Sequence, residues 1–130
     1  MIRKIVKEIK YLFEVFTCGI KNLITWFPII WADRQWDYRF FYEILYKKVL
    51  LLERHHIKYN PFTSKERTLK KMKICKLLCE RLLNNNYIDN AMILHKNEWD
   101  KVQRLSEYTE KQDRVMLFKI LEKEINRWWI

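Results

Sequence analysis

Residues 25–41 read TWFPIIWADRQWDYRFF and hold three of the six Trp residues, one of the two Pro residues and two Asp residues. Because proline biases the residue before it away from α-helical angles, Pro28 predicts a bend after Phe27. Asp33 is suited to cap a following helix, since its carboxylate can accept hydrogen bonds from the free amides of the first turn. The stretch therefore predicts a bend that leads into a capped helix over about residues 34–57.

That helix is expected to be the central one, because it is long and rich in apolar residues. Glu53 and Arg54 are expected on its solvent-exposed side. The helix is expected to end at His55 and His56. The side that faces the core is predicted to consist of Asp37, Phe40, Phe41, Ile44, Leu45, Lys48, Val49 and Leu52.

The chain before this stretch predicts an amphipathic helix over about residues 2–17 that ends near Gly19, the only glycine. A packed helix with a solvated basic face is one interpretation. A membrane-surface helix also fits the composition, although Glu8 and Glu14 speak against it. The longest later run without charge, residues 22–32, is shorter than the roughly 20 apolar residues of a membrane span, so no transmembrane segment is predicted.

The chain after the central helix predicts a linker over residues 58–62, a capping box of Thr63 and Glu66, and a basic helix over 64–84. The core side of this helix is predicted to consist of Leu69, Met72, Cys75, Cys79, Leu82 and Leu83. Three asparagines at 84–86 are expected to stop it.

Beyond these asparagines, Tyr87 and Ile88 are expected to be extended, and Asp89 is expected to cap a short helical turn. Asn97 is expected to cap the last helical region. Whether residues 96–128 form one helix or two stays open, because a polar patch interrupts the apolar pattern at 109–113.

The composition favours helices, since one Gly and two Pro in 130 residues cannot supply the turns of a sandwich or barrel. We predict an all-α single domain of five or six helices, a helical bundle that assembles as a homo-oligomer. Its parts are an N-terminal amphipathic helix over 1–19, central helices over 20–84 and C-terminal helices over 85–130.

A formal net charge of +10 makes the surface attractive to nucleotides, nucleic acid, anionic lipid or acidic proteins. With a single Gly, no glycine-rich phosphate loop and no GxSxG motif can be written, so the sequence predicts a protein that is not an enzyme. Three Cys residues without paired spacing indicate free thiols in a reducing compartment.

Two groups of residues could take part in catalysis or metal binding, but a structural role is the favoured interpretation of each. Asp33 and Asp37 could share a proton in acid–base chemistry, but they also resemble helix caps. The Cys75 and Cys79 thiols could join a histidine at a zinc ion, yet adjacent histidines point in different directions and Cys is commonly buried. No metal or cofactor is therefore predicted.

The remaining functional signal is aromatic rings beside cations. An aromatic ring can stack on a nucleotide base, and an Arg guanidinium can donate two hydrogen bonds to a phosphate. We predict stacking by Trp31 or Trp36. Phosphate contacts are predicted for Arg34, Arg39, His55, His56, Lys70 and Lys73.

The run from Trp26 to Trp31, the DRQWD box at 33–37, and the KICKLL run at 73–78 together resemble a group of small helical proteins from tailed bacteriophages. The resemblance covers about residues 20–83. Most members carry no assigned activity, but the resemblance implies a phage source, and phages encode small basic proteins that bind host nucleotide signals.

The leading functional prediction is thus a non-enzymatic phage protein of the infected host's cytoplasm. It would sequester an anionic nucleotide-derived immune signal. A basic accessory protein that binds DNA or RNA is one alternative. A membrane-surface protein that uses the first helix and the Trp-rich bend is another.

Overall fold

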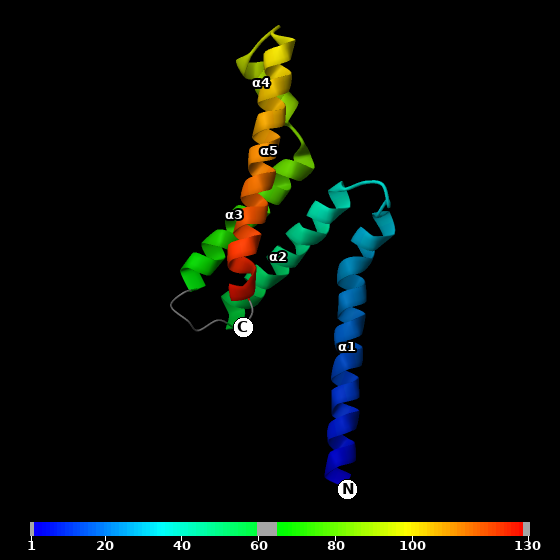
Figure 1. Cartoon of the computed structure of the whole chain (residues 1–130). Coiled ribbons are helices and arrows are strands. Elements are labelled where there is room, and N and C mark those ends of the chain that lie inside the picture. The colour runs from blue at the N-terminus through cyan, green and yellow to red at the C-terminus, as the bar shows by residue number, and fades with distance from the viewer. Residues whose placement is uncertain (1, 60–64, 129–130) are drawn as a thin grey trace. The chain divides into compact units, whose positions relative to one another are not determined.

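The computed structural model describes residues 2–59 and 65–128. The described residues form an all-α domain of five helices, within the predicted five or six, and contain no strand. The helices are α1 (Ile2–Ala32), α2 (Arg39–Tyr59), α3 (Lys65–Asn84), α4 (Tyr87–Leu94) and α5 (Trp99–Glu124), followed by the short 3₁₀ helix η1 (Ile125–Arg127) (Figure 1). Contacts within the chain divide it into two units, residues 1–37 and residues 38–130, which are described in turn.

Unit 1 is built on α1, an unbroken helix of 31 residues. The predicted helix end at Gly19 and the predicted bend at Pro28 are both wrong. Gly19 does not take the left-handed conformation that ends helices, and glycine inside a helix costs only about 1 kcal/mol relative to alanine. Pro28 lies inside the helix and removes the amide partner of the Ile24 carbonyl, a loss of one hydrogen bond that does not end this helix.

The connection between α1 and α2 is a turn rather than the start of a helix. The Asp37 amide donates to the Arg34 carbonyl at 2.8 Å, and α2 begins only at Arg39. The prediction that Asp33 caps a helix starting at residue 34 is therefore wrong. Residues 33–38 instead follow directly on the last turn of α1.

Unit 2 packs around α3, which contacts α2 and α5, while the short α4 packs against α5 (Figure 1). Residues 64–84 were expected to form a basic helix with one apolar side, and α3 confirms that side and the predicted end at Asn84, while residue 64 lies outside the described residues. Its Met72, Cys75 and Cys79 side chains are fully buried. The core is completed by Tyr42, Val49, Leu78, Leu82, Tyr87, Leu117, Ile120 and Trp128.

The core side of α2 differs from the predicted one. Val49 is buried as expected, but Phe41 and Ile44 are exposed. Glu53, which was predicted to be exposed to solvent, is buried. Glu53 is buried because the Lys76 ammonium of α3 pairs with its carboxylate. A buried charge is tolerated when it is paired. The side of α2 that carries Glu53 can therefore be buried, although the number of apolar residues on it predicts that it is exposed to solvent.

The C-terminal helices also begin differently from their predicted positions. Tyr87 and Ile88 are helical rather than extended, and Asp89 lies in the first turn of α4 instead of capping it. Asn97 takes a positive φ of 69°, and Glu98 precedes the first residue of α5, so the predicted Asn97 cap is also wrong.

The open question about the last region is settled, because α5 runs through the polar patch as one helix. Within that patch, Asp113 is buried and accepts a hydrogen bond from the Tyr87 hydroxyl at 2.7 Å. The predicted capping box at Thr63 lies outside the described residues.

Candidate functional site

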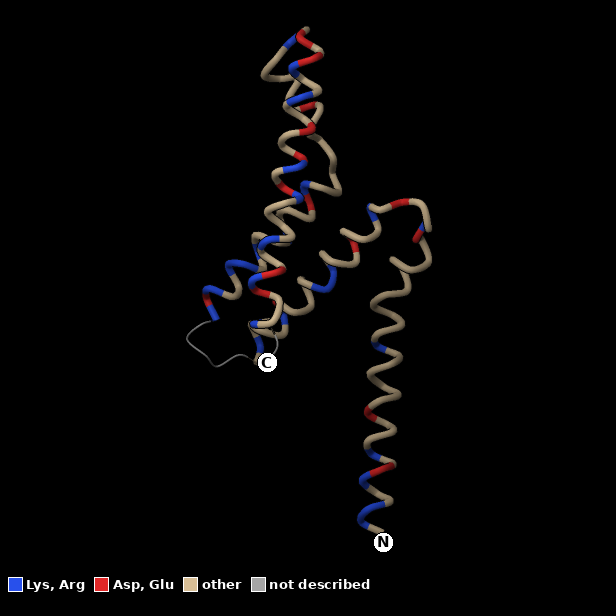
Figure 2. The backbone as a smooth tube through the Cα atoms, in the orientation of Figure 1, with Lys and Arg blue, Asp and Glu red and all other residues tan. Residues whose placement is uncertain are grey.

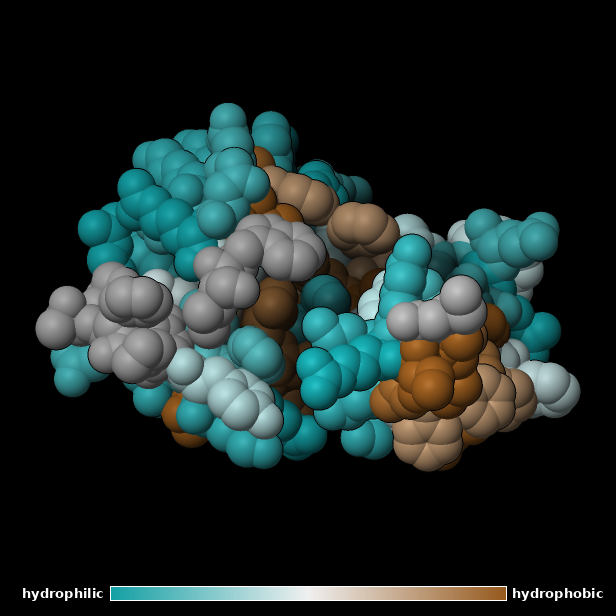
Figure 3. Space-filling model, turned by 90° about the horizontal axis from the view of Figure 1, so that it is seen from below, coloured by the Kyte–Doolittle hydropathy of each residue, from teal (hydrophilic) through white to brown (hydrophobic). Residues whose placement is uncertain are grey.

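The most unusual surface of the chain is the apolar side of α1. Apolar residues recur along it at three- and four-residue steps, the spacing that places side chains on one side of a helix. None of the residues in α1 is buried. This α1 stripe consists of Ile2, Ile5, Ile9, Leu12, Phe16, Ile20, Leu23, Phe27 and Ile30, flanked by Val6, Phe13, Ile24 and Trp31. Figure 3, which looks at α1 from its N-terminal end, shows hydrophobic side chains on one side of the helix and hydrophilic ones on the other.

The opposite side of α1 carries its charges at the same helical spacing. Arg3, Lys7, Lys10, Glu14 and Lys21 follow one another at steps of four, three, four and seven residues. Basic residues gather in the first turns, whereas the last turns of the helix are almost free of charge (Figure 2). The helix is therefore amphipathic along its length and basic at one end.

Aromatic rings gather at the other end of unit 1. The Phe27 and Trp31 rings lie 5.3 Å apart between centroids. Trp31 is 79% exposed, and Trp36, in the turn after the helix, is 82% exposed. Trp combines a large apolar ring with a polar N–H, so it is favoured where an apolar phase meets water.

By length and composition, α1 is able to cross a membrane. The prediction of no transmembrane segment considered only the uncharged run of residues 22–32, whereas an 18-residue stretch of α1 with at most two charged residues is apolar enough for a span. Its 31 residues give a length of roughly 46 Å at about 1.5 Å per residue, more than the roughly 30 Å of a hydrocarbon core.

The positions of the charges favour a helix that lies along a surface over one that spans. Lys21 falls in the middle of residues 11–32, the least charged part of α1, and Glu14 lies two turns before it on the same side. A charge at the centre of a spanning helix costs about 2.5–3.5 kcal/mol on insertion scales. A helix lying in the interface keeps both charges in water and still inserts its apolar side.

The predicted ligand-binding residues are divided between the two units. Trp31, Arg34 and Trp36 belong to unit 1. The other five, Arg39, His55, His56, Lys70 and Lys73, belong to unit 2. Each group is therefore considered within its own unit.

Two of the five residues in unit 2 are held by the fold. His56 is buried, and its Nε2 atom lies 2.8 Å from the carbonyl oxygen of Trp128. The Arg39 guanidinium donates to the Leu83 carbonyl near the C-terminal end of α3 at 2.9 Å, which joins α2 to α3. Burial leaves the His56 ring without direct access to a ligand in water.

The other three residues of that group are exposed. His55 lies against the Tyr59 ring, with 4.8 Å between ring centroids. Lys70 and Lys73 are exposed on α3, where basic residues are dense (Figure 2). These side chains can therefore meet an anion from the surrounding water.

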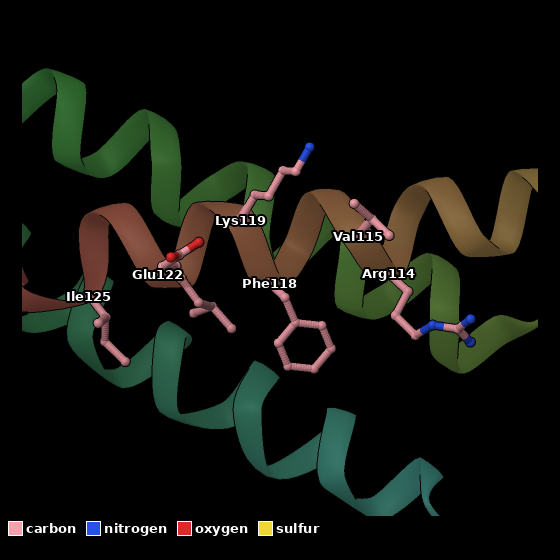
Figure 4. A pocket seen from close by; sticks show the side chains of 7 residues that line it. Arg114, Val115, Phe118, Lys119, Glu122 and Ile125 are labelled. Carbon is pink, nitrogen blue, oxygen red and sulfur yellow. The ribbon is translucent and has the colours of Figure 1, made fainter.

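An open groove of about 820 Å³ runs along α5. In Figure 4 the Phe118 side chain points from α5 toward α2, and its ring stacks on Phe41 at 6.3 Å between centroids. The groove is lined by Arg114, Val115, Phe118, Lys119, Leu121, Glu122 and Ile125. Its lining is mainly apolar.

The cysteines are suited to packing rather than to chemistry. Burial raises the pKa of the Cys75 thiol to about 11 and that of Cys79 to about 12, so both stay protonated at neutral pH. Among the described residues, no group of three or more His, Cys, Asp and Glu side chains is placed to hold a metal ion. Cys18 is the one exposed cysteine, and it lies on α1.

The sequence predictions missed the second half of the α1 stripe as a functional feature. Leu23, Phe27 and Ile30 continue the spacing of the first half, so the signal was present, but Gly19 and Pro28 were interpreted as breaks. Comparison of the chain with protein-family models, with curated proteins and with solved structures finds no match, so the functional interpretation depends on this geometry.

Proposed function

We propose that this protein binds membrane surfaces, and that α1 attaches it by lying along a lipid bilayer with its apolar side inserted. The observation that carries the proposal is the α1 stripe, which continues over the full helix while none of residues 2–32 is buried. Apolar surface of this extent on a monomer marks a membrane or protein contact.

Three features support lipid rather than a second helix as the partner. The apolar side is broad, because Val6, Phe13 and Ile24 widen the stripe beyond the narrow seam of a coiled coil. Its charged side is mainly basic, as in helices that lie on anionic membranes. Its C-terminal end carries Trp26 and Trp31, the residue type enriched at membrane interfaces.

The proposal is tested by floating the full-length protein with vesicles of mixed zwitterionic and anionic lipid. We expect the protein to rise with the vesicles and the Leu12→Glu/Phe16→Glu variant to stay at the bottom. The matched control is Ile93→Glu/Leu94→Glu, which changes two exposed apolar residues of α4 and should float. Wild-type protein that stays at the bottom would overturn the proposal, and a stable oligomer lost in the Leu12/Phe16 variant would identify a second copy as the partner.

Cys18 distinguishes a helix that lies on the surface from one that spans. It is on the charged side of α1, four residues after Glu14 and three before Lys21. On vesicles, a surface helix keeps this thiol in water, where a membrane-impermeant maleimide modifies it. Complete protection of Cys18 on vesicles would show that α1 spans. The buried Cys75 and Cys79 thiols do not interfere, because their raised pKa values keep them unreactive at neutral pH.

Binding of an anionic nucleotide-derived signal is the second candidate, as a phage anti-defence activity. The exposed Lys70 and Lys73 on α3 favour it, together with the exposed His55 ring beside Tyr59. The test incubates the protein with cyclic nucleotides and ADP-ribose derivatives, washes it, denatures it with heat and identifies what is released. This candidate is supported if wild type retains intact nucleotide and Lys70→Gln/Lys73→Gln does not. If wild type retains no nucleotide, this candidate is excluded.

A further inference from the structure

The two ends of α1 differ in the kind of contact they can make. Residues 2–10 contain four basic residues against one acidic residue, Glu8. Residues 11–32 contain a single acidic residue, Glu14, and a single basic residue, Lys21. Four of the five basic residues of the helix therefore lie in its first turns, whereas both of its Trp residues, Trp26 and Trp31, lie in its last turns beside Phe27.

We propose that α1 recognises anionic lipid headgroups through Arg3, Lys4, Lys7 and Lys10, and that its aromatic end inserts without regard to lipid charge. This inference rests on the proposed membrane-surface function, since it divides one binding helix into a selecting end and an anchoring end. Lys and Arg suit the first role, because a long side chain can lay its methylene groups over apolar neighbours while its charge reaches the phosphates.

The positions of the residues along α1 support this division. Lys7 and Lys10 are one turn apart on the charged side, so both can face the headgroups while Ile5 and Ile9 enter the apolar layer. At the other end, the Phe27 and Trp31 rings contact each other and form one apolar block on the stripe. No charged residue lies between Lys21 and Asp33, so insertion of this end buries no charge.

The contribution of the basic residues to membrane affinity can be estimated. Each Lys or Arg close to an anionic membrane strengthens binding by about fivefold, so the loss of two charges should weaken it by roughly 30-fold. The attraction should also be screened at high salt, where the Debye length falls from about 10 Å at 0.1 M to about 3 Å at 1 M. Insertion of the aromatic end should respond far less to salt.

The experiment measures partition of the full-length protein onto vesicles of pure phosphatidylcholine and of phosphatidylcholine with one quarter phosphatidylglycerol. We expect wild type to prefer the anionic vesicles and to lose the preference at 1 M salt. Lys7→Gln/Lys10→Gln should lose most of the preference while still binding phosphatidylcholine. Phe27→Ser/Trp31→Ser should weaken binding to both vesicle types.

Unit 2 is also basic, so a control for general charge is needed. Lys119→Gln/Lys123→Gln removes two exposed charges one turn apart on α5 and should leave the preference intact. Equal weakening by this control and by Lys7→Gln/Lys10→Gln would overturn the inference, and so would equal wild-type binding to the two vesicle types. Wild type that binds neither vesicle overturns the membrane function itself, which keeps the two failures distinguishable.

Discussion

The Nε2 atom of His56 lies 2.8 Å from the backbone carbonyl oxygen of Trp128, which joins the last turns of α2 to the residue that follows η1. A carbonyl oxygen can only accept a hydrogen bond, so Nε2 carries the proton in this contact. His56 is 1% exposed and Trp128 is 2% exposed. The contact therefore satisfies two polar groups inside the core across 72 residues of chain.

Replacement of His56 by leucine should destabilise the protein by about 1–3 kcal/mol, because the Trp128 carbonyl would lose a buried partner. The measurement is the free energy of unfolding in urea. The neighbouring His55→Leu is the control, since His55 is exposed, and it should change stability by less than about 0.5 kcal/mol. Equal losses in the two variants would show that the His56 contact is not specific.

Leu117 connects α5 to the core, and it is 0% exposed. Leu117→Ala should lower the free energy of unfolding by about 2–5 kcal/mol through lost burial and the cavity that remains. Met116 next to it is 48% exposed, so Met116→Ala should have a small effect. Equal effects at these adjacent positions would contradict the described packing of α5 against α3.

Arg39 was predicted as a phosphate-binding residue, and its guanidinium donates to the Leu83 carbonyl. Arg39→Ala should therefore lower stability by about 0.5–1.5 kcal/mol, the range of a typical hydrogen bond at a solvent-accessible site. Arg34→Ala in unit 1 should leave the unfolding of unit 2 unchanged. Thermal unfolding followed by circular dichroism distinguishes them, and an unchanged midpoint for Arg39→Ala would argue against this contact as a stabilising one.

Stability should fall at alkaline pH because of the two buried thiols. Above the ordinary thiol pKa of 9.0 the unfolded chain loses these protons, whereas the folded chain holds them until about 11 at Cys75 and about 12 at Cys79. The folded state then binds more protons, so the free energy of unfolding decreases as pH rises from about 9 to about 12. Burial also raises the pKa of Tyr87, which adds a loss in the same direction.

The test of this pH dependence compares urea unfolding at pH 8, 9, 10 and 11. The Cys75→Ala/Cys79→Ala variant should show a shallower decrease than wild type, whatever its stability at pH 8. Cys18→Ala should follow wild type, since Cys18 is exposed. A double variant with the wild-type slope would exclude the thiols as the cause.

The sequence predicted the features that depend on local periodicity. The apolar spacing of Leu69, Met72, Cys75 and Cys79 identified the core side of α3, because apolar residues that recur every three or four positions lie on one side of a helix. The asparagines at 84–86 were correctly expected to end that helix, and Asn85 takes a positive φ of 51° there. The predicted breaks at Gly19 and Pro28 failed, because such residues weaken a long apolar helix without ending it.

The surroundings of the candidate site residues could not be predicted from the sequence, because the availability of a side chain depends on its tertiary partners. Arg39 and His56 are residue types that bind phosphate, and the sequence cannot show that carbonyl oxygens distant in the chain accept their hydrogen bonds. Glu53 looked solvated for the same reason, since its partner Lys76 is on another helix.

By itself, the sequence determined that the chain is helical and which residues of α1 and α3 share an apolar side. Helical periodicity is a local property, and scarce Gly and Pro leave few alternatives to long helices. Only the tertiary structure decided which apolar sides the protein covers. The α3 side is buried by α2 and α5, whereas the α1 stripe belongs to a unit whose described residues contain no second helix that could cover it. Two sides with the same spacing therefore have different roles, because burial depends on the elements that the rest of the chain brings to each one.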